Sequence, residues 1–348
     1  MSLVTRDAID PSPARSVPAA VAHRDVAIDT MRGVAILMVV GIHSFRQPLG
    51  SWETLTDAAL RPCVPIFLFA SGYLTALSGR VPLVRRLKTA IVPYAIAFVP
   101  AYVYMALHNP AMDHRLSTTV ARFVLAYVFV YYYVFVYLGC TIALWLAFSA
   151  AGNAAGPSGR VVAFLLAILF ALIAGSYLDP LASRLGLPEA LTEELRMRDI
   201  PFWFSFMALG ALVGLTDMRY RLAATPALMF GAALLAYSIY AAVRLFRLGD
   251  AADYDSIAFF GYAALLCLTL FLLDARVPFL ASCGSGSYFI YLWHIFIVMA
   301  LRDHASLDRL GSVASFAITY VVTAFGSILA LLAVRANVPP RLSRWLGA

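Results

Sequence analysis

Long apolar segments alternate with short polar stretches along the chain after residue 24. A helix needs about 17 to 25 mostly apolar residues to cross the hydrocarbon core of a membrane. Ten segments approach or meet that length, near residues 27–46, 62–79, 90–107, 124–148, 161–178, 201–215, 225–243, 257–273, 286–302 and 312–334. The pattern predicts an all-α, polytopic integral membrane protein with about ten transmembrane helices.

The composition excludes a soluble domain. Hydrophobic residues make up 62% of the 348-residue chain and charged residues only 13%, whereas a soluble domain is about half apolar and about a quarter charged. Residues 1–24 are polar and contain no apolar run that could form a signal peptide core. We expect a disordered cytoplasmic tail at 1–24, one transmembrane domain at 25–336 and a cytoplasmic C-terminal tail at 337–348.

The positive charge is spread over short loops and indicates membrane topology. The formal net charge is +7, and Lys88 is the only lysine, so arginine supplies nearly all of it. Loops rich in arginine and lysine stay in the cytoplasm, so the dense cluster from Arg80 to Lys88 is expected there. An even number of helices then places both termini in the cytoplasm. This distribution gives no indication of nucleic-acid binding.

Two other features limit the possible functions. The cysteines are scattered, with no CxxC pair and no matching histidine spacing, and predict neither a metal site nor a disulfide framework: Cys63, Cys140, Cys267 and Cys283. The longest loop, 179–200, is either an extracytoplasmic lid or a solvated connector. The hydropathy shows no internal repeat.

The first apolar segment carries three ionisable residues at membrane depth. Ten uncharged residues separate Arg32 from His43, too few to span the membrane alone, and ionisable groups at such depth are usually functional. Eleven positions of a helix leave about 20° after three turns, so both side chains share one face about 16 Å apart. Asp29 is close enough to pair with Arg32. Alternatively, Arg32 only reaches for the headgroups and His43 only caps the helix.

Three motifs in this order carry a family resemblance. They are DTMRGVAILMVVGIH from Asp29 to His43, PIFLFASGYL from Pro65 to Leu74, and SYFIYLWH from Ser287 to His294. Together they resemble membrane acyltransferase family 3, bacterial enzymes that modify surface and secreted glycans. The resemblance covers nearly all of the membrane portion, and it places the protein in the bacterial inner membrane.

The resemblance implies an enzyme that uses acyl-CoA, expected to be acetyl-CoA, without a metal. The expected acceptor is a glycan or lipid-linked saccharide, with membrane lipids as the surroundings. Carried over by position, His43 and Arg32 are the essential residues, and we add Asp29. The family also has two arginines three residues apart that are proposed to contact the donor. Here Arg85 is followed by Lys88, which loses the bidentate fork of arginine.

Elementary chemistry assigns roles to the same residues. Transfer to a hydroxyl needs a base, and histidine, with an ordinary pKa of about 6.5, offers a neutral imidazole; His43 acts as that base or carries the acyl group itself. Coenzyme A is polyanionic, so Arg85, Arg86 and Lys88 are expected to bind its phosphates, or they serve only as a topology signal. Arg32 is expected to position the substrate.

Four further residues are candidates for substrate binding. Ser71 and Tyr73 on the second apolar segment either contact substrate or join helices through their hydroxyls. Tyr291 and His294 lie one turn apart, and they either line a tunnel or form buried hydrogen bonds. The aromatic run from Tyr131 to Tyr137 is expected to form an interfacial belt or to pack between helices, with sugar stacking as an alternative.

The sequence therefore predicts a membrane O-acyltransferase. We expect acetyl transfer from acetyl-CoA to a sugar hydroxyl of an exopolysaccharide, a lipid-linked repeat unit or another envelope glycan. Transfer of succinyl or a longer acyl group is an alternative. A transporter would use the same intramembrane charges for relay or binding, and a regulatory protein could keep the fold without catalysis.

Overall fold

The computed structural model describes residues 25–128, 130–152, 156–216, 218, 225–248 and 256–348, and the expected tail at 1–24 lies outside them. The described residues form helices and no strand. The long helices are α1 (Val26–Ser44), α3 (Cys63–Ser78), α4 (Leu83–His108), α6 (Tyr132–Gly152), α7 (Gly156–Ser176), α10 (Ile200–Leu215), α12 (Pro226–Leu245), α13 (Ile257–Leu273), α15 (Ser287–His304) and α16 (Ser312–Asn337). The shorter ones are α2 (Ser51–Leu60), α5 (Leu116–Val124), α8 (Leu178–Arg184), α9 (Glu189–Met197), α14 (Pro278–Ser285) and α17 (Pro340–Trp345).

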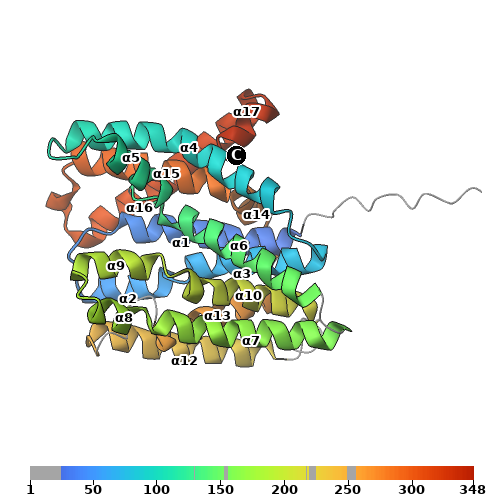
Figure 1. Cartoon of the computed structure of the whole chain (residues 1–348). Coiled ribbons are helices and arrows are strands. Elements are labelled where there is room, and N and C mark those ends of the chain that lie inside the picture. The colour runs from blue at the N-terminus through green and yellow to red at the C-terminus, as the bar shows by residue number, and fades with distance from the viewer. Residues whose placement is uncertain (1–24, 129, 153–155, 217, 219–224, 249–255) are drawn as a thin grey trace, which may run out of the picture.

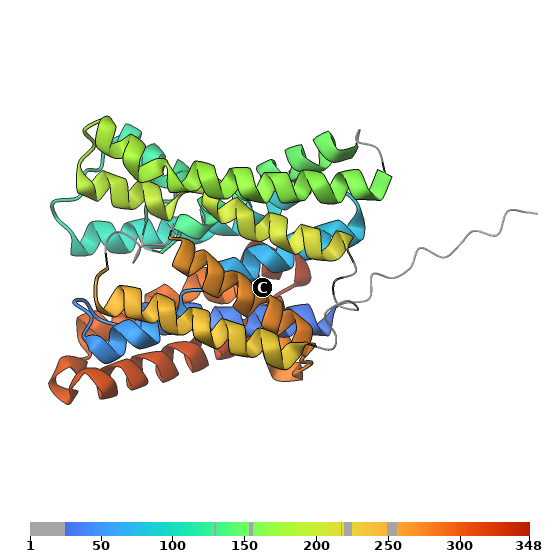
Figure 2. The ribbon, with the colours of Figure 1, turned by 90° about the horizontal axis from the view of Figure 1, so that it is seen from below.

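The long helices run along a common direction, as two perpendicular views show (Figures 1 and 2). Each of the ten predicted segments overlaps one of them, which confirms the all-α polytopic membrane fold. Eight described helices, some joined end to end, are long and apolar enough to cross a membrane, and the bent pair of α14 and α15 makes a ninth. The 17-residue α13 is apolar but shorter.

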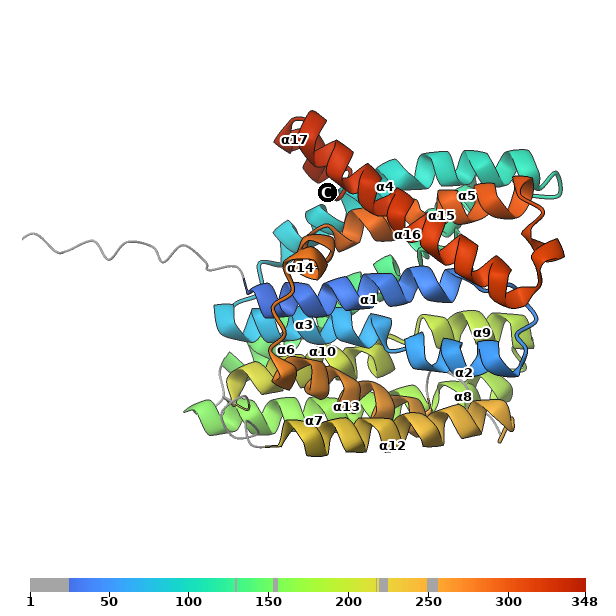
Figure 3. The same ribbon diagram turned by 180° about the vertical axis from the view of Figure 1, so that it is seen from behind.

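Helix α1 lies inside the bundle and packs against α3, α14, α15 and α16 (Figure 3). We name the two ends of the bundle after the first and last residues of α1: the Val26 end and the Ser44 end. The short helices α2, α5, α8 and α9 gather toward the Ser44 end (Figure 1). The connections between the long helices at that end therefore contain most of the short helices.

A sharp bend beside α1 fixes the start of α15. No side chain would fit at Gly33 of α1, because a Cβ there would overlap the carbonyl oxygen of Leu280 in α14. Gly284 is equally close to the carbonyl oxygen of Asp29, so the two backbones touch. The chain then bends by 80° between α14 and α15. As a result, Ser287 begins α15 next to Arg32.

Three segments differ from the simplest expectation. The predicted span 124–148 is interrupted after α5, and α6 begins only at Tyr132, because Tyr131 turns into the bundle and donates a hydrogen bond to the Leu292 carbonyl oxygen at 2.8 Å. The loop 179–200 contains α8 and α9, joined by a 2.7 Å ion pair between Arg196 and Asp179. The segment 337–348 contains α17, which packs against α4 and α16.

Candidate active site

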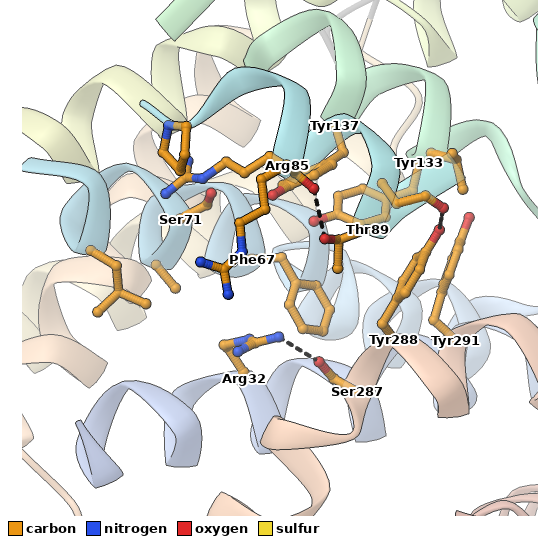
Figure 4. A pocket seen from close by; sticks show the side chains of 16 residues that line it. Arg32, Phe67, Ser71, Arg85, Thr89, Tyr133, Tyr137, Ser287, Tyr288 and Tyr291 are labelled. Atoms are coloured by element: carbon orange, nitrogen blue, oxygen red, sulfur yellow. Dashed lines mark hydrogen bonds between the residues drawn. The ribbon is translucent and has the colours of Figure 1, made fainter. Parts of the chain in front are cut away.

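A cavity of about 410 Å³ lies in the half of the bundle toward the Val26 end, between α1, α3, α4, α6 and α15 (Figure 4). Three of its lining side chains are arginines, and several others carry hydroxyl groups. The lining consists of Arg32, Phe67, Ala70, Ser71, Leu74, Pro82, Arg85, Arg86, Thr89, Ala90, Tyr133, Val134, Tyr137, Ser287, Tyr288 and Tyr291.

Arg32 reaches into this cavity from α1. Its Nη1 lies 3.4 Å from Oδ1 of Asp29, which confirms the predicted pairing, and its Nη2 donates a hydrogen bond to Oγ of Ser287 at 3.2 Å. Figure 4 shows this second bond across the floor of the cavity. The side chain remains 30% exposed. It is therefore held in place at one side and accessible to a ligand at the other.

The first turns of α4 bring two further arginines to the cavity. Arg85 and Arg86 both line it, and Thr89 follows on the same helix. Nη1 of Arg86 is inaccessible to solvent and has no hydrogen-bond partner among the described residues. A buried guanidinium donor without an acceptor is unfavourable, so an anionic ligand would stabilise this side of the cavity. Lys88 is exposed and is not part of the lining.

Tyrosines from α6 and α15 form one wall of the cavity. Tyr288 donates a hydrogen bond to the Ala90 carbonyl oxygen at 2.5 Å, and Tyr291 donates one to the Val130 carbonyl oxygen at 2.6 Å. The ring of Tyr133 meets that of Tyr291 edge to face at 5.5 Å. The aromatic run that contains Tyr133 thus faces the interior. Of the two expectations for this run, packing between helices is confirmed for Tyr133 and for Tyr131, which is buried, and an interfacial belt is not.

His43 lies farther toward the Ser44 end and is not part of the cavity lining. Its ring centroid is 5.4 Å from that of His294 on α15. The ring of His294 is in turn 6.4 Å from that of Tyr291, which lines the cavity. The sequence predicted Arg32 and His43 on one helix face; the structure adds Tyr291 and His294 as the side chains that connect them.

The hydrogen bonds of His294 define its tautomer. The side chain is fully buried, and its Nδ1 lies 3.0 Å from the Ile290 carbonyl oxygen and 2.8 Å from that of Tyr291. Carbonyl oxygens only accept, so Nδ1 carries the proton. Nε2 then has a lone pair, and no described residue donates a hydrogen bond to it. His294 therefore offers an unused acceptor beside His43.

Arg302, which the sequence analysis did not single out, secures the end of α1. Its Nη2 donates hydrogen bonds to the carbonyl oxygens of His43 at 2.8 Å and Phe45 at 2.7 Å. These oxygens have no partner within α1, because they belong to its last turn. Arg302 thereby joins α15 to the backbone that carries His43.

Of the two substrate-binding candidates on α3, Ser71 and Tyr73, only Ser71 faces the cavity. Ser71 lines the cavity, whereas the ring of Tyr73 packs against Phe271 of α13 at 4.8 Å. Gly72, between them, lets α3 touch α10 at Met207. Among the other lining residues, Thr89 was not considered for substrate, and Tyr133 and Tyr137 only as part of the aromatic run for which sugar stacking was an alternative. Their signal was a helical spacing of four between the two tyrosines and of three between Arg86 and Thr89.

These features define a class: a polytopic helical membrane protein with a cation-lined cavity at one end and a histidine pair deeper in the bundle. The sequence profile of the acyltransferase domain of acyltransferase family 3 matches residues 25–332. The chain belongs to this family, and it is a membrane O-acyltransferase. No curated protein and no solved structure gave a significant match.

Proposed function

We propose that the protein transfers an acetyl group from acetyl-CoA to a sugar hydroxyl of an exopolysaccharide, a lipid-linked repeat unit or another envelope glycan. The protein would lie in the bacterial inner membrane with both termini in the cytoplasm. The main support is the cavity with three arginines at the Val26 end, followed along α1 and α15 by a histidine pair. Family membership supports acyl transfer in the membrane. The identity of the donor, the identity of the acceptor and the orientation in the membrane are what we propose.

The phosphates of acetyl-CoA would bind at Arg85 and Arg86, with Nη1 of Arg86 as an unused donor. Both residues lie in the first two turns of α4, at the Val26 end. Lys88 was expected to take part, but it lies outside the cavity, so we leave it out of the proposed donor site. The pantetheine arm would extend along the tyrosine wall past Arg32 toward the histidines.

His43 would act as the general base and His294 would position it. In this proposal a rotation of the His43 ring brings one N–H to the unused Nε2 of His294. The other nitrogen of His43 is then free to accept the proton of the sugar hydroxyl. The sugar oxygen then attacks the thioester carbon, and the carbon–sulfur bond breaks. The thiolate takes the proton from His43 and leaves as coenzyme A. Arg32 would position the donor.

The experiment uses the detergent-purified protein with acetyl-CoA or succinyl-CoA labelled in the acyl group and methyl glycosides as acceptors. We expect label in an ester on the glycoside, with acetyl transferred faster than succinyl. His43→Ala should lower the rate by about 10²- to 10⁴-fold. His108→Ala, at an exposed histidine outside the site, is the matched control and should leave the rate unchanged.

Two further measurements test the proposal. Label that enters the lumen of proteoliposomes without an ester bond would indicate transport. Sidedness is tested with Arg80→Cys and Asn109→Cys, which place an exposed thiol at the Val26 end and the Ser44 end respectively, while the four native cysteines are buried. The first thiol should react with an impermeant maleimide on the face to which acetyl-CoA is supplied, and the second on the opposite face.

A further inference from the structure

A second cavity, of about 200 Å³, lies at the Ser44 end. It is bounded by the residues that follow α1, by the first turn of α2 and by the start of α16. Its walls begin at Ser44 and Phe45, directly after His43 in the chain. The cavity therefore begins next to the proposed base in the chain, and it lies at the opposite end of the bundle from the arginine-lined cavity.

One carboxylate in this cavity lacks a partner. Glu53 is only 9% exposed, and its Oε2 is inaccessible to solvent and accepts no hydrogen bond from any described residue. A buried carboxylate oxygen without a donor is unfavourable. Arg46 also lines the cavity, so the site as a whole is not strongly acidic. These features favour a neutral ligand with hydroxyl donors over a cation.

Two aromatic side chains, Phe45 and Phe316, also line the cavity, and Trp52 packs against them from outside the lining. Phe45 and Phe316 are stacked with centroids 4.3 Å apart, and Trp52 meets both rings edge-on at 5.8 Å. Trp52 is fixed because its Nε1 donates a hydrogen bond to Oγ of Ser312 at 3.2 Å. A sugar ring presents apolar C–H groups on its faces and hydroxyls at its edge. Aromatic side chains and a carboxylate that line the same cavity match both parts of such a ligand.

We propose that this cavity, the Glu53 pocket, binds one neutral sugar residue of the acceptor. Its volume of about 200 Å³ is below the roughly 300 Å³ at which pockets for larger ligands begin, so it accommodates a single ring. Glu53 accepts a hydrogen bond from a sugar hydroxyl, and Phe316 contacts the ring. The proposal rests on the proposed function, because it assigns the sugar acceptor a place beside His43.

The test measures binding and transfer separately in the full-length protein. Methyl glycosides of glucose, galactose and mannose are the probes, and binding is followed by quenching of tryptophan fluorescence and by ligand-detected NMR. Glu53→Gln should weaken binding of the preferred glycoside by roughly 10- to 100-fold, the value of a hydrogen bond to a charged group. Its affinity for acetyl-CoA should remain unchanged. Glu193→Gln, at an exposed residue, is the matched control.

Phe316→Leu provides an independent variant, should Glu53→Gln fail to fold, and it should also weaken glycoside binding while acetyl-CoA binding is kept. The inference is overturned if no glycoside binds the wild type, or if both variants bind glycosides as the wild type does. The proposed function fails in a different way, through glycoside binding without transfer of the acetyl group.

Discussion

The close contact between α3 and α10 predicts that a glycine-to-alanine substitution there destabilises the protein, whereas the same substitution on α12 stabilises it slightly. At Gly72 of α3, a Cβ would overlap the carbonyl oxygen of Met207 and lie 2.9 Å from the Ala211 nitrogen. Both atoms belong to the backbone of α10, so neither can rotate away. The Cβ would lie 1.9 Å from that oxygen, so the helices must move apart by about 1.5 Å before the two atoms reach ordinary contact. Gly72→Ala should therefore lower the free energy of unfolding by about 1–3 kcal/mol.

Gly231→Ala is the matched control on α12. No atom lies within 4 Å of a Cβ at Gly231, so the substitution meets open space. Alanine is a better helix former than glycine by about 0.5–1 kcal/mol, and this variant should be slightly more stable than the wild type. Thermal unfolding in detergent measures both variants. Equal midpoints for the two, or a Gly72→Ala midpoint at or above the wild-type value, would refute the reasoning.

Two further predictions concern charged groups. Asp57 is 3% exposed at its side chain and pairs with Arg61 at 2.8 Å and with Arg244; Asp57→Asn should cost about 3–5 kcal/mol, because two largely buried guanidinium groups lose their shared carboxylate. A loss below about 1 kcal/mol in the same unfolding assay would contradict that estimate. Arg86→Gln should raise the KM for acetyl-CoA by roughly tenfold or more with little change in kcat, whereas Lys88→Gln should alter neither, and equal effects would disprove the assignment.

The helices were predictable because their signal is local. A run of apolar residues long enough to cross a membrane must form a helix to satisfy its own backbone, and a long helix overlaps each of the ten segments, although the one at 124–148 is interrupted. Pairing of Asp29 with Arg32 followed from helical spacing alone. The break before Tyr132 was not predictable in this way, because it depends on the hydrogen bond of Tyr131 to Leu292, far away in the chain.

In the candidate site too, features set by local spacing were predictable, and features that depend on distant parts of the chain were not. Helical periodicity placed Arg32 and His43 on one face, but it could not show that α15 brings Tyr291 and His294 between them. Nor could spacing distinguish Lys88 from Arg86, because the difference is which side of α4 faces the cavity. The Glu53 pocket depends on three chain segments that meet only in the folded protein, and no motif in the sequence indicates it.

The central claim is that one end of the site binds the donor and the other performs the transfer. It is tested most directly by measuring the Kd of acetyl-CoA and the single-turnover rate of acetyl transfer for wild type, Arg32→Ala and His43→Ala. We expect Arg32→Ala to weaken acetyl-CoA binding, whereas His43→Ala should bind acetyl-CoA like the wild type and transfer acetyl at least 100-fold more slowly. A His43→Ala variant that transfers acetyl at the wild-type rate would contradict it.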